Sequence, residues 1–191
     1  PTNSSEDSSN ALSLATSYTD TAGNSGPAAT TSNYEVETLA PSVNTFTMSD
    51  TALKIGDNAT VTLVFSEAVI SFSSSDDITV PNGTLSTMTS SDNITWTGTF
   101  TPTNSSEDSS NTLSLATSYT DTAGNSGPAA TTSNYSVDTR APTLSEVSAV
   151  STPTTDNTPS YTFSSNESGT ITYGGSCSSS TSSASSGNNA I

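Results

Sequence analysis

Apolar residues alternate with polar ones over short stretches of this chain, and the clearest case lies near residue 63. Val61, Leu63 and Phe65 occupy every second position there, which is the spacing of a strand with one face turned toward a core. The same alternation recurs between Trp96 and Phe100. No segment has an apolar repeat of three to four residues. We therefore expect strands and no helices.

Residues 40–140 contain a series of such segments, separated by turn-forming sequences such as Gly56-Asp57-Asn58. The expected strands fall within 43–48, 61–65, 69–72, 78–80, 85–88, 94–100, 113–115 and 135–137. Short strands at this spacing are typical of an antiparallel β-sandwich, so the sequence predicts an all-β fold. We place Trp96 in its core, with a sugar-stacking role as the alternative.

The chain repeats itself at an interval of 101 residues, because residues 1–41 recur as residues 102–142. Ala11, Glu35, Glu37 and Leu39 of the first copy are replaced by Thr112, Ser136, Asp138 and Arg140 in the second. An interval of this size equals one small domain, and repeats at domain spacing indicate an array of modules.

The repeat predicts three segments. Residues 1–39 form the C-terminal part of one module, residues 40–140 a complete module, and residues 141–191 the N-terminal part of a third module of different subtype. The first segment holds only two or three strands, which do not bury a core alone. We therefore expect residues 1–39 either to pair with chain outside this sequence or to be poorly ordered.

The third segment shows two alternating pairs of aromatic or apolar residues, at 161–163 and 171–173, which predict two strands. From Ser176 onward the sequence is nearly all Ser, Thr, Ala, Gly and Asn. We interpret this stretch as a wide loop followed by another strand. Cys177 has no second cysteine in the sequence; pairing with a cysteine beyond it and a free thiol are both open.

The charge balance excludes several classes of partner. Two basic residues stand against eighteen acidic ones, which gives a formal net charge of -16. A nucleic-acid groove needs clustered basic side chains, so we expect no nucleic-acid binding. No run of about 18 apolar residues is present, so we expect no direct insertion into a membrane. The natural counter-charge is a cation, and carboxylate and amide oxygens suit Ca²⁺.

Several segments together resemble the bacterial Ig-like repeats of large surface proteins and adhesins. The segments that carry the resemblance are 48–57, 61–69, 119–125 and 137–142, and the segments 154–159 and 163–167 resemble a sister subtype. The resemblance covers essentially the whole chain. It implies tandem immunoglobulin-like sandwiches arranged end to end, an extracellular or bacterial cell-surface location, and an architectural role as a stalk that carries a binding tip away from a cell.

Oxygen ligands are expected to converge where one module meets the next. In an up-and-down sandwich, the loop after the second strand and the loop before the last strand lie at the end where the chain enters. We therefore predict a Ca²⁺ site at the first joint from Glu37, Glu67, Asp121 and Asn125, and a second from Asp138 with Asn166 or Glu167. The alternative is that Asp-Thr-Ala-Gly-Asn is simply a good turn.

Catalysis has little support in this sequence. There is no histidine, and Cys177 has no basic neighbour that would lower its pKa. The adjacent acids Asp76 and Asp77 are interpreted as solvated loop residues, as is the pair at 107–108. We expect a spacer that is not an enzyme, whose partners are neighbouring modules and other copies in a filament. A carbohydrate- or surface-binding module is the alternative.

Overall fold

The computed structural model describes residues 3–191, which divide into two compact units with a boundary between Thr139 and Arg140. Among these residues, no helix has the length and apolar character that spanning a membrane requires. The division predicted at residues 39 and 40 from the repeat stays a prediction.

Residues 40–139 fold as a β-sandwich. Its elements are β5 (Val43–Met48), β6 (Ala52–Lys54), β7 (Ala59–Phe65), β8 (Val69–Ile70), α1 (Ser74–Asp77), β9 (Ile78–Thr79), β10 (Gly83–Leu85), β11 (Thr95–Pro102), β12 (Glu107–Asn111), β13 (Ser114–Leu115), β14 (Thr120–Asp121), β15 (Ala130–Thr131) and β16 (Tyr135–Asp138). One layer has the strand order β10-β11-β7-β5. The prediction of an all-β sandwich is confirmed.

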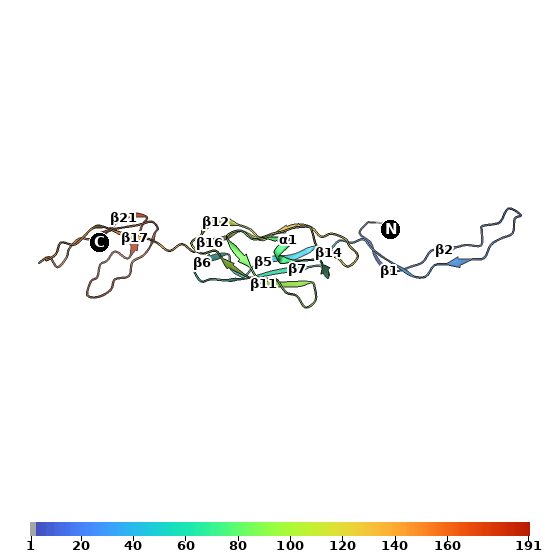
Figure 1. The fold of residues 1–191 in the computed structure, drawn as a ribbon, viewed down its shortest axis with the longest axis horizontal. Helices are drawn as coiled ribbons and strands as arrows, with labels where there is room; N and C mark the ends of the chain where they lie inside the picture. Colours follow the sequence, from blue (N-terminus) through green and yellow to red (C-terminus); the bar gives the residue numbers. More distant parts are fainter. Residues whose placement is uncertain (1–2) are drawn as a thin grey trace. The chain divides into compact units, whose positions relative to one another are not determined.

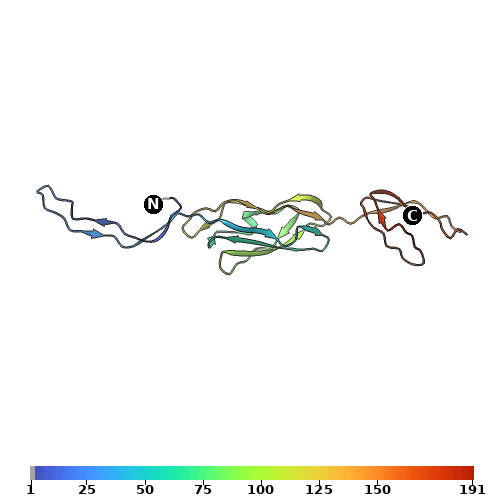
Figure 2. The same ribbon diagram turned by 180° about the vertical axis from the view of Figure 1, so that it is seen from behind.

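The second layer is built around a long hairpin. Strands β12 and β13 pair antiparallel with β16 and β15, and the edge strands β6, β9 and β8 add to β16, β13 and β14. The pairing of β16 with β6 is parallel. In Figures 1 and 2 this hairpin, in yellow and orange, lies across from the cyan and green strands of the first layer.

The core lies between these two layers and follows the predicted alternation. Val61, Leu63 and Phe65 of β7 are buried, while the residues between them are less so. Aromatic rings join the layers: the ring centroids of Phe65 and Tyr119 are 4.8 Å apart, and those of Phe100 and Tyr135 are 5.2 Å apart. Burial raises the pKa of both tyrosines to about 12.

Trp96 occupies a half-buried position beside this core. Its ring packs edge to face with Phe72, with centroids 4.9 Å apart, and lies against the buried core. The structure thus favours the core role over a sugar-stacking role for Trp96. Its indole nitrogen is buried without a hydrogen-bond partner among the described residues.

Residues 3–39 form a two-stranded ladder with the same pairing as the hairpin of the second layer. The strands are β1 (Glu6–Asn10), β2 (Ser13–Leu14), β3 (Ala29–Thr30) and β4 (Tyr34–Glu37). Strand β1 pairs with β4, and β2 with β3. In the part of the chain that the structure describes, no third strand joins either pair.

The segment between β8 and β9 differs from the prediction. We expected no helix and two solvated acids, but residues 74–77 form one helical turn and Asp77 is buried. The Asp77 carboxylate accepts hydrogen bonds from the Ser73 amide, at 2.8 Å, and from the Ser118 hydroxyl. The expectation was wrong for Asp77 because its partner Ser118 lies 41 residues away, and a contact at that distance cannot be inferred from the local sequence pattern. Asp76 is exposed, as expected.

The unit of residues 140–191 is a smaller set of strands: β17 (Leu144–Ser148), β18 (Thr162–Ser165), β19 (Gly169–Thr170), β20 (Ser183–Ala184) and β21 (Gly187–Ala190). One sheet has the order β17-β18-β21, and β19 pairs with β20. The prediction that the Ser-rich stretch returns to a strand is confirmed by β20 and β21. Cys177 is exposed and unpaired.

Replacing Asp77 by Ala should destabilise residues 40–139 by roughly 2–3 kcal/mol, because the change leaves the Ser73 amide and the Ser118 hydroxyl without their acceptor. Urea unfolding followed by the fluorescence of Trp96, the single tryptophan, measures the change. Asp76→Ala is the matched control, because Asp76 is exposed and accepts only a hydrogen bond from the Ser73 hydroxyl. Equal effects of the two substitutions would contradict the role given to Asp77.

Candidate functional site at the linker before residue 40

The loop after β14 is a compact turn organised by one carboxylate. The Oδ1 atom of Asp121 accepts hydrogen bonds from the amides of Ala123 and Asn125, both at 2.9 Å. The Oδ2 atom accepts from the Asn125 side chain at 2.8 Å. Gly124 has φ +94°, a backbone conformation that glycine adopts readily. Burial opposes ionisation, but the hydrogen bonds from Asn125 prevail, so the pKa of Asp121 is lowered.

The same turn forms in the first copy of the repeat. Asp20 accepts from the amides of Ala22 and Asn24 at 2.9 Å and from the Asn24 side chain at 2.8 Å. Gly23 again has φ +94°. Asp20 is fully exposed, so neither burial nor a neighbouring linker is needed to build the loop. Its geometry is a property of the local sequence.

The loop in the second copy also holds the linker that enters the sandwich. The Asn125 side-chain amide lies 3.4 Å from the carbonyl oxygens of both Glu37 and Leu39. The Glu37 carboxylate accepts from the Leu39 amide at 2.6 Å and so tightens the same bend. A side chain fixed by its own turn therefore donates to the backbone of residues 37–39. We define this arrangement as the linker clip.

Glutamates gather beside the linker clip. Glu6, Glu35, Glu37 and Glu67 line one hollow together with Thr122 and Ala123. Partial burial raises the pKa of Glu67, and the negative charges of Asp121, Glu37 and Glu6 raise it further. These carboxylates repel one another in a site that offers no basic side chain. The hollow is thus a region of unfavourable electrostatics that a cation would relieve.

Of the predicted Ca²⁺ ligands, the structure brings together Glu37, Glu67, Asp121 and Asn125. Within residues 3–191, however, no three acidic or cysteine side chains are arranged to hold a metal ion. Both oxygens of Asp121 already accept hydrogen bonds from the loop, and Asn125 turns its amide group, not its carbonyl oxygen, toward the linker. The residues as placed do not form a coordination sphere for calcium.

The ligands predicted for the second joint lie in different units. Asp138 ends β16, in register with Glu107 and Lys54. Glu167 accepts a hydrogen bond from the Asn166 side chain at 2.9 Å, and the Asn166 Oδ1 atom in turn accepts from the Thr143 amide at 2.6 Å. The second calcium site stays a prediction.

Sequence reasoning missed Glu6 and Glu35 as members of the first site. The signal that could have found Glu6 is the hairpin itself, because the register of β1 and β4 places Glu6 opposite Glu37. Glu35 is one of the positions at which the two copies differ, with Ser136 as its counterpart. Of the acids that this copy contributes to the hollow, only Glu35 has no acidic counterpart in the second copy.

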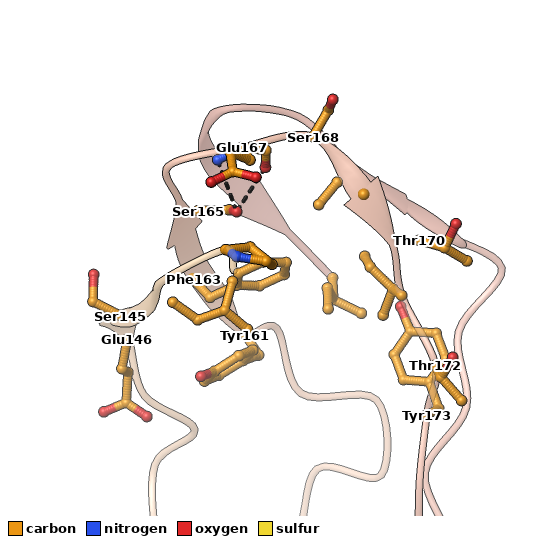
Figure 3. Close-up of a pocket in the computed structure, with 16 residues that line it drawn as sticks. Ser145, Glu146, Tyr161, Phe163, Ser165, Glu167, Ser168, Thr170, Thr172 and Tyr173 are labelled. Atoms are coloured by element: carbon orange, nitrogen blue, oxygen red, sulfur yellow. Dashed lines mark hydrogen bonds between the residues drawn. The ribbon is translucent and has the colours of Figure 1, made fainter. Parts of the chain in front are cut away.

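A second concave feature lies within residues 140–191. A groove of about 520 Å³ is lined by Tyr161, Phe163 and Tyr173, and Figure 3 shows these rings facing the open space between strands. Tyr161 and Phe163 are stacked, with centroids 6.3 Å apart. At its rim, the Ser165 hydroxyl donates to the carbonyl oxygen of Glu167 at 2.6 Å. Of these rings only Phe163 lies in a strand, β18, and the lining also includes Gly169 and Ala184 of the β19–β20 pair. The groove therefore lies between the two sheets of this unit.

Comparison with known proteins identifies the sandwich. The model of the family described as bacterial Ig-like domain matches residues 37–137, slightly more than half of the chain. The comparison with curated proteins gave no match. The comparison with solved structures gave no match either.

Replacing Asn125 by Ala should loosen the linker, because the clip loses its donor to the carbonyl oxygens of Glu37 and Leu39. Amide relaxation by NMR should then show greater mobility of residues 38–40. Asn24→Ala is the matched control: it removes the same hydrogen bond within the turn but leaves the linker contacts in place. Equal mobility of residues 38–40 in both variants would argue against the linker clip.

Stability of the unit that contains Glu67 should decrease as the pH rises from 4.5, the ordinary pKa of a glutamate, toward the raised pKa of Glu67. The folded state holds this proton more tightly than the unfolded state, so deprotonation favours unfolding. Glu67→Gln should flatten the pH dependence of the urea midpoint in this range. Glu146→Gln, the same change within residues 140–191, serves as the control; identical profiles for wild type and Glu67→Gln would contradict the assignment.

Proposed function

Because the chain belongs to the bacterial Ig-like domain family, we propose that it is a spacer segment of a long repetitive surface protein. Domains of this family are commonly found in surface or extracellular proteins and are non-catalytic. In the proposed role, sandwiches follow one another through short linkers and separate a distal binding part from the cell. The chain's partners are then the neighbouring modules and, in a filament, other copies.

The observation that carries this proposal is the linker clip. A spacer transmits position only if the connection between modules is stiff, and Asn125 ties the backbone of residues 37–39 to the sandwich that follows. The linker residues 34–41 contain no glycine, and Pro41 restricts Ala40 as well as itself. Both features reduce the number of orientations open to the joint.

The net charge of -16 supports the same role. Modules that all carry negative charge repel one another, which disfavours folding back into a globule. Calcium is the second part of the proposal. The repulsion around Glu67 would favour a divalent ion, although Glu37 and Glu67 would have to close around it, since the carboxylates are not arranged as ligands.

A carbohydrate- or surface-binding module is the alternative, and it requires aromatic rings that are exposed on one face. In residues 40–139 the rings of Phe46, Phe65, Phe100, Tyr119 and Tyr135 are buried. The aromatic groove in residues 140–191 is the other candidate for such binding, but its Phe163 is buried and its Tyr161 and Tyr173 are only partly exposed. The spacer role is therefore preferred.

The spacer role is tested with arrays of two, four and six copies of residues 40–140 joined head to tail, each copy carrying Ser136→Glu, Asp138→Glu and Arg140→Leu so that every joint has the side chains of residues 35, 37 and 39. Small-angle scattering should give a maximum dimension that grows in proportion to the number of copies, because stiff joints prevent collapse. Each array is measured with calcium and with a chelator. If calcium stiffens the joint, its removal should reduce the maximum dimension of the array. A dimension that grows only as the cube root of copy number would overturn the spacer role; identical curves in both solutions would remove calcium alone.

A further inference from the structure

One sequence occurs twice in this chain, and its apolar residues have opposite environments in the two copies. Leu12, Leu14, Tyr18 and Tyr34 are 65%, 51%, 42% and 40% exposed, whereas their counterparts Leu113, Leu115, Tyr119 and Tyr135 are 0%, 2%, 0% and 0% exposed. We call the first four residues the open face. The residues are identical in kind, so the difference comes only from what packs on them.

The backbone that presents the open face is the same in both copies. Glu6 pairs with Glu37 and Leu14 with Ala29, as Glu107 pairs with Asp138 and Leu115 with Ala130. Each Tyr of the loop also rests on a glycine: a Cβ on Gly26 would lie 1.9 Å from the Tyr18 ring, and a Cβ on Gly127 would lie 2.1 Å from the Tyr119 ring. The open face is preorganised, so covering it requires little rearrangement.

The covering of the second copy is supplied by residues 40–101. Strands β6, β9 and β8 pair with β16, β13 and β14. Phe65 and Phe100 pack on Tyr119 and Tyr135. The buried face is thus covered by one continuous half of the sandwich.

Side-chain hydrogen bonds also join residues 40–101 to residues 102–139. The Tyr135 hydroxyl donates to the Pro81 carbonyl oxygen at 2.6 Å. The Asn82 side chain donates to Asp108 at 2.8 Å and to Asn111 at 2.7 Å. The three residues that make these bonds are retained in the first copy, because Asp108, Asn111 and Tyr135 correspond to Asp7, Asn10 and Tyr34. Residues 40–101 therefore match the open face in polar as well as apolar contacts.

Residues 40–101 of the same chain do not reach the open face while their own sandwich is intact. Their core side is already filled by residues 102–139. The entry and exit of the chain also lie at opposite ends of the sandwich. The chain enters at Val43, which pairs with Phe65. Asp138, the equivalent of Glu37, pairs with Lys54 beyond the other end of β5. A linker of a few residues does not span these two ends.

We propose that the open face binds a half-module with the sequence of residues 40–101, supplied by a separate stretch of polypeptide. The four positions at which the copies differ lie outside the open face. Of these, Ser136 donates to the Thr51 carbonyl oxygen at 3.4 Å, so its replacement by Glu35 removes one hydrogen bond while the apolar contacts stay. The two copies are then interchangeable receptors for one kind of half-module. This inference goes beyond the spacer role and does not depend on it, since half-modules can pair whether or not the joints are stiff.

The test adds a polypeptide of residues 40–101 to the full chain of residues 1–191. The two are mixed in urea, refolded together, and analysed by native mass spectrometry and amide exchange. We expect a one-to-one complex in which the amides near Leu12 and Leu14 exchange more than about 100-fold more slowly than in the chain alone. Amides near Leu113 and Leu115 provide the internal reference for a covered face.

Two variants locate the binding. Tyr18→Ser combined with Tyr34→Ser should abolish the complex without affecting residues 40–139, to which neither tyrosine belongs. A probe carrying Phe65→Ser and Phe100→Ser, which lacks the rings that pack on the tyrosines, should not bind. Complex formation that survives the tyrosine substitutions would mean that the probe displaces the chain's own residues 40–101, and would overturn the proposal.

A fused chain covers the case in which the probe aggregates. Residues 40–101 placed directly before Pro1 recreate the Thr-Pro junction of residues 101–102. Amide exchange near Leu12 and Leu14 should then slow to the rate seen near Leu113 and Leu115. Rapid exchange near Leu12 and Leu14 in the fused chain would overturn the proposal irrespective of the mixing experiment.

Discussion

The fold depends on the contact between two halves of one sandwich. Residues 102–139 form a hairpin whose apolar side chains have no other place to be buried, and residues 40–101 supply the strands that cover them. Burying a side chain such as Leu113 or Leu115 contributes roughly 1.5–3 kcal/mol. In a domain of this size the whole stability is only about 5–15 kcal/mol, so this contact decides whether the sandwich exists.

The loop of residues 121–125 is a locally determined turn that also binds the linker. Its carboxylate and amide satisfy each other within the turn, and the same bonds appear in residues 20–24, where the side chains are exposed. Once a linker lies beside it, the already fixed Asn125 donates to the linker carbonyl oxygens. A rigid donor that needs no ordering on contact loses little entropy when it binds, which suits a joint between modules.

Substitutions between the two copies are concentrated at the joints. Residues 35, 37 and 39 differ from 136, 138 and 140, while every residue of the open face is retained. The joints can therefore differ in charge and packing, with Leu39 in one and Arg140 in the other, while the half-modules keep a common interface. Of the acids that line the hollow around Glu67, Glu35 is replaced by Ser136 in the second copy, while Glu37 becomes Asp138 and keeps its charge.

The sequence by itself determined the all-β class and its most regular strands. Alternation around Leu63 and Phe100 identifies β7 and β11, because side-chain alternation acts over a few residues. The pairing of the strands, the helical turn at 74–77 and the irregular chain at 171–173 are seen only in the structure. Alternation also predicted which face of β7 is buried, but at other positions only the tertiary structure decided burial. It placed Asp77 in the core beside Ser118, brought Glu6 to Glu67, and covered Leu113 while leaving Leu12 exposed. No pattern within 41 nearly identical residues separates these last two, since burial is set by the strands that pack on them from elsewhere in the chain.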